Sequence, residues 1–118
     1  MVELDAVATA ALERDNLRLR SLVQDMLQES PQLEAWPEPK TRDPQLLSIA
    51  AGLVELLALR RHQPPPAWAT AIGAAPEPYF LLKTATRLKR LRDLCLNEAP
   101  EPLRKRNLYA PPNFLEFA

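Results

Sequence analysis

The sequence predicts an all-α protein, and three observations support this class. Apolar residues make up 47% of the 118 residues, and most of them are Leu and Ala, which favour helices over strands. These residues recur with the three- and four-residue spacing of amphipathic helices. The 13 prolines all lie after residue 30, where they separate helical blocks by proline-rich connections. The pattern predicts three main helices followed by an extended tail.

The first predicted helix covers residues 3–29, within an N-terminal segment of residues 1–30. Its apolar side chains repeat at i, i+3, i+4, i+7 and i+8 in two sets, which begin at Leu4 and Leu19. Written as heptads, the helix has Asn16 at an a position, where Asn fixes register in two-stranded coiled coils. This pattern predicts self-association through Leu12, Asn16, Leu19, Val23 and Met26. Packing of the same helix on its own domain is the alternative.

A linker is predicted over residues 31–43, because its prolines and charges prevent regular structure. The second predicted helix covers residues 44–62. Asp43 suits its N-cap, and the proline that follows loses no hydrogen bond in the first turn. Apolar side chains cover most of its circumference, which predicts a central position in a helical domain over residues 44–118. Gly52 inside this helix predicts a close crossing with another helix.

The third predicted helix covers residues 79–98. Lys83, Arg87 and Arg90 follow at i, i+4 and i+7 and are expected on its basic side. The chain then continues as an extended, proline-rich tail whose last five residues concentrate apolar side chains. Because chain ends are usually polar and frayed, this apolar end indicates docking on the same chain or on another.

Charge is distributed unevenly, although 15 basic and 15 acidic residues cancel over the whole chain. Residues 1–36 have a net charge of −4, and residues 79–118 have a net charge of +4. This polarity suits contact with an acidic partner. The alternative is that the acidic and basic ends face each other or the solvent.

The sequence contains little catalytic chemistry. One Cys and one His cannot build a metal site within one chain, and two glycines cannot form a P-loop or a GxGxxG turn. We therefore expect a non-enzymatic protein with no catalytic residue, metal ion or other cofactor. An active site completed by a second chain is the remaining enzymatic alternative.

The expected location is the cytoplasm, without a membrane contact. The N-terminal residues lack the basic and apolar regions of a signal peptide. The longest apolar stretch, residues 46–59, is too short to cross a bilayer of about 30 Å.

We expect the basic third helix and the tail to bind another protein. The expected contact residues are Lys83, Arg87, Arg90, Arg104, Arg106, Tyr109, Phe114 and Phe117. The alternative is a homo-oligomeric regulator whose basic helix contacts the phosphates of nucleic acid. The zero net charge of the chain, and the lack of Asn, Gln or Ser among the cations, disfavour recognition of bases.

Residues 65–118 also carry four motifs that resemble a known group of proteins. They are Pro-Glu-Pro at 76–78, Leu-Cys at 94–95, Pro-Glu-Pro-Leu-Arg at 100–104 and Ala-Pro-Pro-Asn-Phe at 110–114. The motifs are similar to those of small uncharacterised bacterial proteins encoded beside minimal nucleotidyltransferases in toxin–antitoxin-like pairs. The resemblance implies an antitoxin-like protein that binds a nucleotidyltransferase-type toxin and blocks it sterically. It assigns no functional residue.

Overall fold

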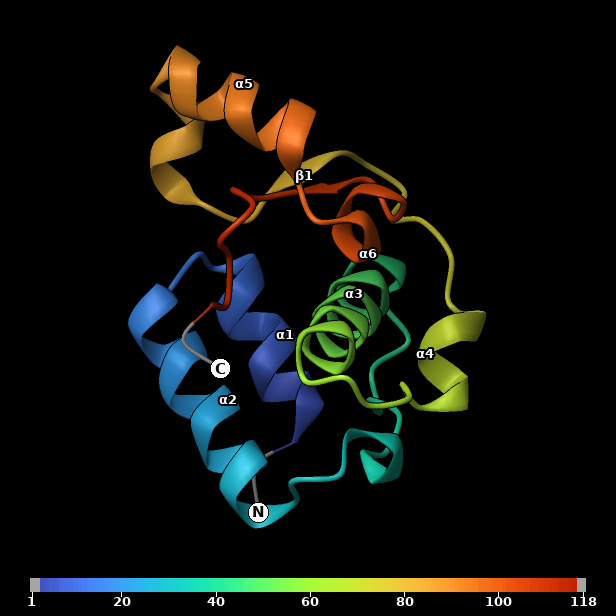
Figure 1. Cartoon of the computed structure of the whole chain (residues 1–118). Helices are drawn as coiled ribbons and strands as arrows, with labels where there is room; N and C mark the ends of the chain where they lie inside the picture. The colour runs from blue at the N-terminus through green and yellow to red at the C-terminus, as the bar shows by residue number, and fades with distance from the viewer. Residues whose placement is uncertain (1–2, 117–118) are drawn as a thin grey trace.

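The computed structural model describes residues 3–116 and is mostly helical, in agreement with the predicted class (Figure 1). In chain order the elements are α1 (Leu4–Leu12), α2 (Asn16–Glu29), η1 (Leu33–Ala35), α3 (Pro44–Arg60), α4 (Ala67–Ala71), β1 (Tyr79–Phe80), η2 (Lys83–Thr86), α5 (Lys89–Glu98), α6 (Glu101–Arg104) and β2 (Leu108–Tyr109). The two 3-10 turns are labelled η. The predicted arrangement of three main helices is not found, because two of the expected helices are divided.

The predicted helix over residues 3–29 is two helices. α1 ends at Leu12, and Arg14 adopts a left-handed conformation with a φ of 59°, which interrupts any continuous helix. Asp15 then begins α2 as its N-cap, because its carboxylate accepts a hydrogen bond from the backbone N–H of Arg18. The cap therefore decides the boundary, although the apolar pattern continues on both sides of it.

The predicted helix over residues 79–98 is replaced by three shorter elements, β1, η2 and α5. β1 pairs in parallel with β2, so that Tyr79 lies opposite Leu108 and Phe80 lies opposite Tyr109. This pairing satisfies backbone groups that a helix would have satisfied within itself. Only α5 keeps the helical conformation that the sequence predicts.

Helix α3 agrees with the second predicted helix and lies at the centre of the fold (Figure 1). The Asp43 carboxylate accepts the backbone N–H of Gln45, and the proline after Asp43 occupies the first turn. A Cβ at Gly52 would lie 3.0 Å from Leu103 and 3.3 Å from Leu108. The glycine therefore allows the α6–β2 segment to approach the helix closely.

The C-terminal segment is part of the core. Leu108, Phe114 and Leu115 are buried and join the apolar cluster that α1, α2 and α3 form. The Arg60 guanidinium, at the end of α3, donates hydrogen bonds to the carbonyl of Phe114 and, at 2.9 Å, to that of Pro112. The apolar end of the described chain thus docks on the chain itself.

The predicted linker over residues 31–43 is an ordered connection that contains η1 and the buried Trp36. The Asp5 carboxylate on α1 accepts the backbone N–H groups of Lys40 at 3.0 Å and Thr41 at 2.8 Å. Burial raises the pKa of the Asp5 carboxyl, but these hydrogen bonds outweigh burial and hold the pKa below its usual value. The connection is therefore fixed to α1.

Candidate interaction surface

The predicted partner-binding residues are divided between the surface and the core. Four of them are exposed, namely Lys83, Arg87, Arg90 and Arg104. Tyr109 is half-buried and packs against Phe80, whereas Arg106 and Phe114 are only 1% and 7% exposed. Phe117 lies outside the described residues. The side chains of Arg106 and Phe114 are therefore not available at the surface.

The predicted self-association residues lie mainly inside the chain's own core. Leu19, Val23 and Met26 are 2%, 0% and 4% exposed. Leu12 is half-buried, and Asn16 is exposed. α2 packs beside α1 (Figure 1), which is the alternative that the sequence left open. Self-association through these residues stays a prediction. In the structure, their apolar side chains pack within one chain.

Arg106 joins three elements of the fold in the interior. Its guanidinium forms an ion pair with Glu55 of α3 and donates to the carbonyls of Ala69 at 2.8 Å and Pro102 at 2.9 Å. Glu55 also pairs with Lys105 at 3.2 Å. Because a buried charge needs a counter-charge and hydrogen-bond partners, this network fixes α4 and α6 on α3.

Arg14 has a structural role that no sequence pattern indicated. Its Nε donates to the carbonyl of Phe80 at 2.9 Å, and its guanidinium lies 4.5 Å from the centre of the Tyr79 ring. The Tyr79 hydroxyl donates in turn to the carbonyl of Leu12. These contacts hold β1 on the turn between α1 and α2. The partners are more than 60 residues apart in the chain, beyond the reach of local periodicity.

Five exposed cations lie on a peripheral unit, which we define as residues 83–98 and call the η2–α5 unit. It lies beyond β1, away from the bundle of α1, α2 and α3, and α5 packs chiefly against η2 (Figure 1). Ala85 and Cys95 are fully buried but lie outside the main core cluster. Burial raises the pKa of the Cys95 thiol. The unit thus has a small core of its own.

The surface of the η2–α5 unit combines positive charge with exposed apolar groups. Its exposed cations are Lys83, Arg87, Lys89, Arg90 and Arg92. Within residues 3–116, no salt bridge engages any of these five side chains. Leu88 and Leu96 are 56% and 42% exposed. These seven side chains give the η2–α5 unit both positive charge and exposed apolar groups, which suits contact with an acidic partner.

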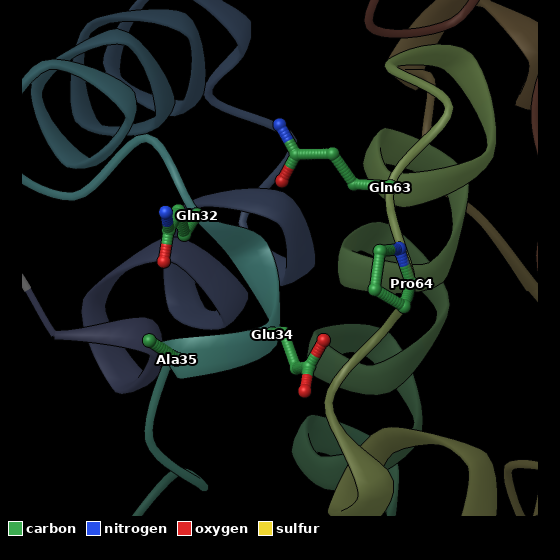
Figure 2. Close-up of a pocket in the computed structure, with 5 residues that line it drawn as sticks. All are labelled: Gln32, Glu34, Ala35, Gln63 and Pro64. Carbon is green, nitrogen blue, oxygen red and sulfur yellow. The ribbon is translucent and has the colours of Figure 1, made fainter.

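A surface cavity between η1 and the segment after α3 has a different character. It has a volume of about 610 Å³ and is lined by Gln32, Glu34, Ala35, Gln63 and Pro64 (Figure 2). In Figure 2 the Glu34 side chain points from η1 toward the Pro64 segment, and Gln63 points back toward η1. The Gln63 amide already accepts from the Leu33 N–H at 3.0 Å and donates to the Pro31 carbonyl at 3.1 Å. Gln63 therefore helps to hold η1 and the residues before it in place.

The described part of the chain, residues 3–116, contains no group of three or more His, Cys, Asp and Glu side chains that could hold a metal ion. Among the helices over the same residues, none is both long and apolar enough to cross a membrane.

Comparison with models of protein families found no match, and comparisons with curated proteins and with solved structures found none either. The resemblance of residues 65–118 to antitoxin-like proteins therefore stays a prediction. The function has to be argued from the η2–α5 unit itself.

Proposed function

We propose that the protein is a non-enzymatic binding partner of another protein, and that it makes this contact through the η2–α5 unit. The observation that carries the proposal is the presence of five exposed cations and two exposed leucines on one small peripheral unit. Arginine is enriched in protein interfaces, and burial of leucine in a contact removes apolar surface from water. The unit offers both kinds of side chain together.

In its finer form, the proposal is that of an antitoxin-like protein that blocks a nucleotidyltransferase-type toxin sterically. Two arguments support it. The motifs in residues 65–118 are similar to those of such partners, and a nucleotidyltransferase site contains carboxylates that bind its metal. Arginine binds carboxylates through two parallel hydrogen bonds. Of the arginines that the sequence predicts at this contact, Arg87, Arg90 and Arg104 are exposed.

A second candidate is binding to the phosphates of nucleic acid, as a regulator. The density of cations between residues 83 and 92 favours it, and each neutralised phosphate would make the affinity fall as salt rises. The two exposed leucines have no role in a phosphate contact. This candidate also needs a dimer. Leu19, Val23 and Met26, which were predicted to form the dimer contact, are buried within the chain itself and are not available to a second copy. We therefore rank it second.

The test is capture of partners from a lysate of the source organism at moderate salt, with both protein and nucleic acid identified. The tagged wild type is compared with two triple charge reversals, Lys83→Glu/Arg87→Glu/Arg90→Glu on the unit and Arg18→Glu/Arg42→Glu/Arg61→Glu at exposed positions elsewhere. Both variants change the net charge equally, so that only the position of the change differs.

We expect the wild type and the control variant to recover the same stoichiometric protein, and the variant on the unit to recover it at least about tenfold less. Equal recovery by all three proteins would contradict the proposed surface. Recovery of nucleic acid alone, lost as salt rises, would favour the second candidate.

A further inference from the structure

Two exposed leucines and a cation follow one another from the N-cap of α5 into the helix. Leu88, Arg92 and Leu96 follow at i, i+4 and i+8, and the Arg92 backbone N–H donates to the Leu88 carbonyl at 2.9 Å. Arg92 and Leu96 lie one turn apart within α5, and Leu88 precedes them as the N-cap of the helix, with an extended backbone. All three side chains are exposed, whereas the neighbouring Cys95 is turned into the small core. We call these three residues the α5 ridge.

We infer that the α5 ridge binds an acidic amphipathic helix of the partner protein, with a carboxylate between two apolar side chains. This inference rests on the proposed function and names the chemistry of the partner. Leu88 and Leu96 are eight residues apart, which corresponds to about 12 Å along a helix. A partner helix with an apolar, an acidic and an apolar residue at i, i+4 and i+8 has the same spacing. It would place its carboxylate opposite Arg92.

Charge complementarity supports an acidic occupant. The η2–α5 unit contains five cations and only two acidic residues, Asp93 and Glu98, and so has a net charge of +3. The attraction would steer an acidic helix toward the unit and set its register on Arg92. The leucines on either side would exclude water from this ion pair, which strengthens it.

A second copy of this chain fits the ridge poorly. Arg92 is the middle residue of the ridge, so a twofold axis through its centre would bring two Arg92 guanidinium groups together. Like charges that face each other in an interface cost free energy. The ridge therefore disfavours symmetric pairing with itself. Nucleic acid is also a poorer occupant, because a phosphate backbone leaves both leucines uncovered.

The test uses the full chain and a fluorescent synthetic helical peptide of about 16 residues with Leu, Glu and Leu at i, i+4 and i+8 and acidic flanks. A matched peptide carries Lys in place of the central Glu. Binding is measured by fluorescence anisotropy against the wild type and three variants, Arg92→Glu, Leu88→Ala/Leu96→Ala and the control Leu59→Ala. Leu59 is 61% exposed on α3 and lies outside the ridge.

We expect the Glu peptide to bind the wild type and the Leu59→Ala control equally. Arg92→Glu and the double leucine variant should each bind it about tenfold more weakly. The Lys peptide should show the reverse preference and bind Arg92→Glu better than the wild type. Circular dichroism and unfolding midpoints equal to those of the wild type will show that the variants fold. Equal binding of both peptides to the wild type, or binding of neither, would overturn the inference.

The same variants separate this inference from the proposed function. If the peptides fail but the triple charge reversal on the unit still abolishes capture of the native partner, the proposed function stands and only the occupant of the ridge is wrong. If that reversal leaves capture intact, the proposed function fails. A dimer in sedimentation that the double leucine variant abolishes would assign the ridge to a second copy. Binding of a DNA or RNA duplex that depends on Arg92 but not on the leucines would assign it to nucleic acid.

Discussion

Replacement of Glu55 should destabilise the protein more than replacement of its buried partner Arg106. The Arg106 side chain is 2% exposed, and that of Glu55 is 13% exposed. In Glu55→Leu, the guanidinium stays charged and keeps only the carbonyls of Ala69 and Pro102. In Arg106→Met, the Glu55 carboxylate keeps Lys105 at 3.2 Å and some contact with solvent.

The expected magnitudes follow from this asymmetry. Removing one partner of a buried pair costs about 3–5 kcal/mol, because the other charge stays buried, and we expect about 4 kcal/mol for Glu55→Leu. Arg106→Met should cost only about 1–2 kcal/mol, because the remaining carboxylate is still paired. The double variant should cost about 2 kcal/mol, less than Glu55→Leu alone, because it leaves no unpaired charge in the core. The coupling energy of the pair is then about 3–4 kcal/mol.

Urea unfolding followed by tryptophan fluorescence measures these differences, since Trp36 is buried and Trp68 is half-buried in the native fold. A domain of this size has a stability of about 6–18 kcal/mol, so the losses are measurable. The exposed Glu29→Leu serves as a control and should change stability by less than about 0.5 kcal/mol. A loss below about 1 kcal/mol for Glu55→Leu, or strict additivity in the double variant, would refute the reasoning.

Three further predictions concern stability and local opening. Asp5→Asn should lower the free energy of unfolding at neutral pH. In the folded protein the pKa of Asp5 lies below its usual 3.8. The wild type is therefore more stable than the variant above about pH 4, and this difference is lost as the pH falls through the pKa of Asp5 in the folded state. A stability difference that does not change with pH would contradict this. Gly52→Ala should cost about 1 kcal/mol, because crowding against Leu103 and Leu108 outweighs the better helix propensity; a raised Tm would contradict it. Iodoacetamide should label Cys95 much more slowly in the native protein than in urea. The slow labelling of the native protein should occur through local opening of the η2–α5 unit. A labelling rate with the full urea dependence of global unfolding would contradict local opening.

The parts of the fold that depend on local signals could be predicted from the sequence. The Asp43 cap and the apolar run after it predicted α3, and the cap is present in the structure. The break within residues 79–98 depends on the pairing of β1 with the distant β2, and the break within residues 3–29 combines the local Asp15 cap with distant contacts of Arg14. Arg14 ends the first helical segment in a conformation that its contacts with Tyr79 and Phe80 support. Periodicity within one segment contains no information on such contacts.

The candidate surface could be predicted in part, for a related reason. The run of cations after residue 82 indicated a charged surface, and these cations are exposed, but Lys83 lies on η2 and Arg90 on α5, so they do not share the side of one helix. Arg104, Lys105 and Arg106 follow one another in the sequence with the same charge, yet only Arg106 is buried. The sequence signal for its burial is indirect: Glu55 is the one charge within the apolar stretch of α3, and such a charge needs a partner in the core.

Three arginines determine how the function can be tested. Arg14 fixes β1 to the turn between α1 and α2. Arg60 and Arg106 fix the C-terminal segment and α6 to α3, through main-chain carbonyls and one ion pair. Deletion of residues 107–118 would therefore remove buried side chains from the core, and a loss of binding after it would report unfolding as much as a lost contact. The exposed side chains of the η2–α5 unit lie outside the main core. Point substitutions there change the surface and leave the core intact, so they separate binding from folding where a truncation would not.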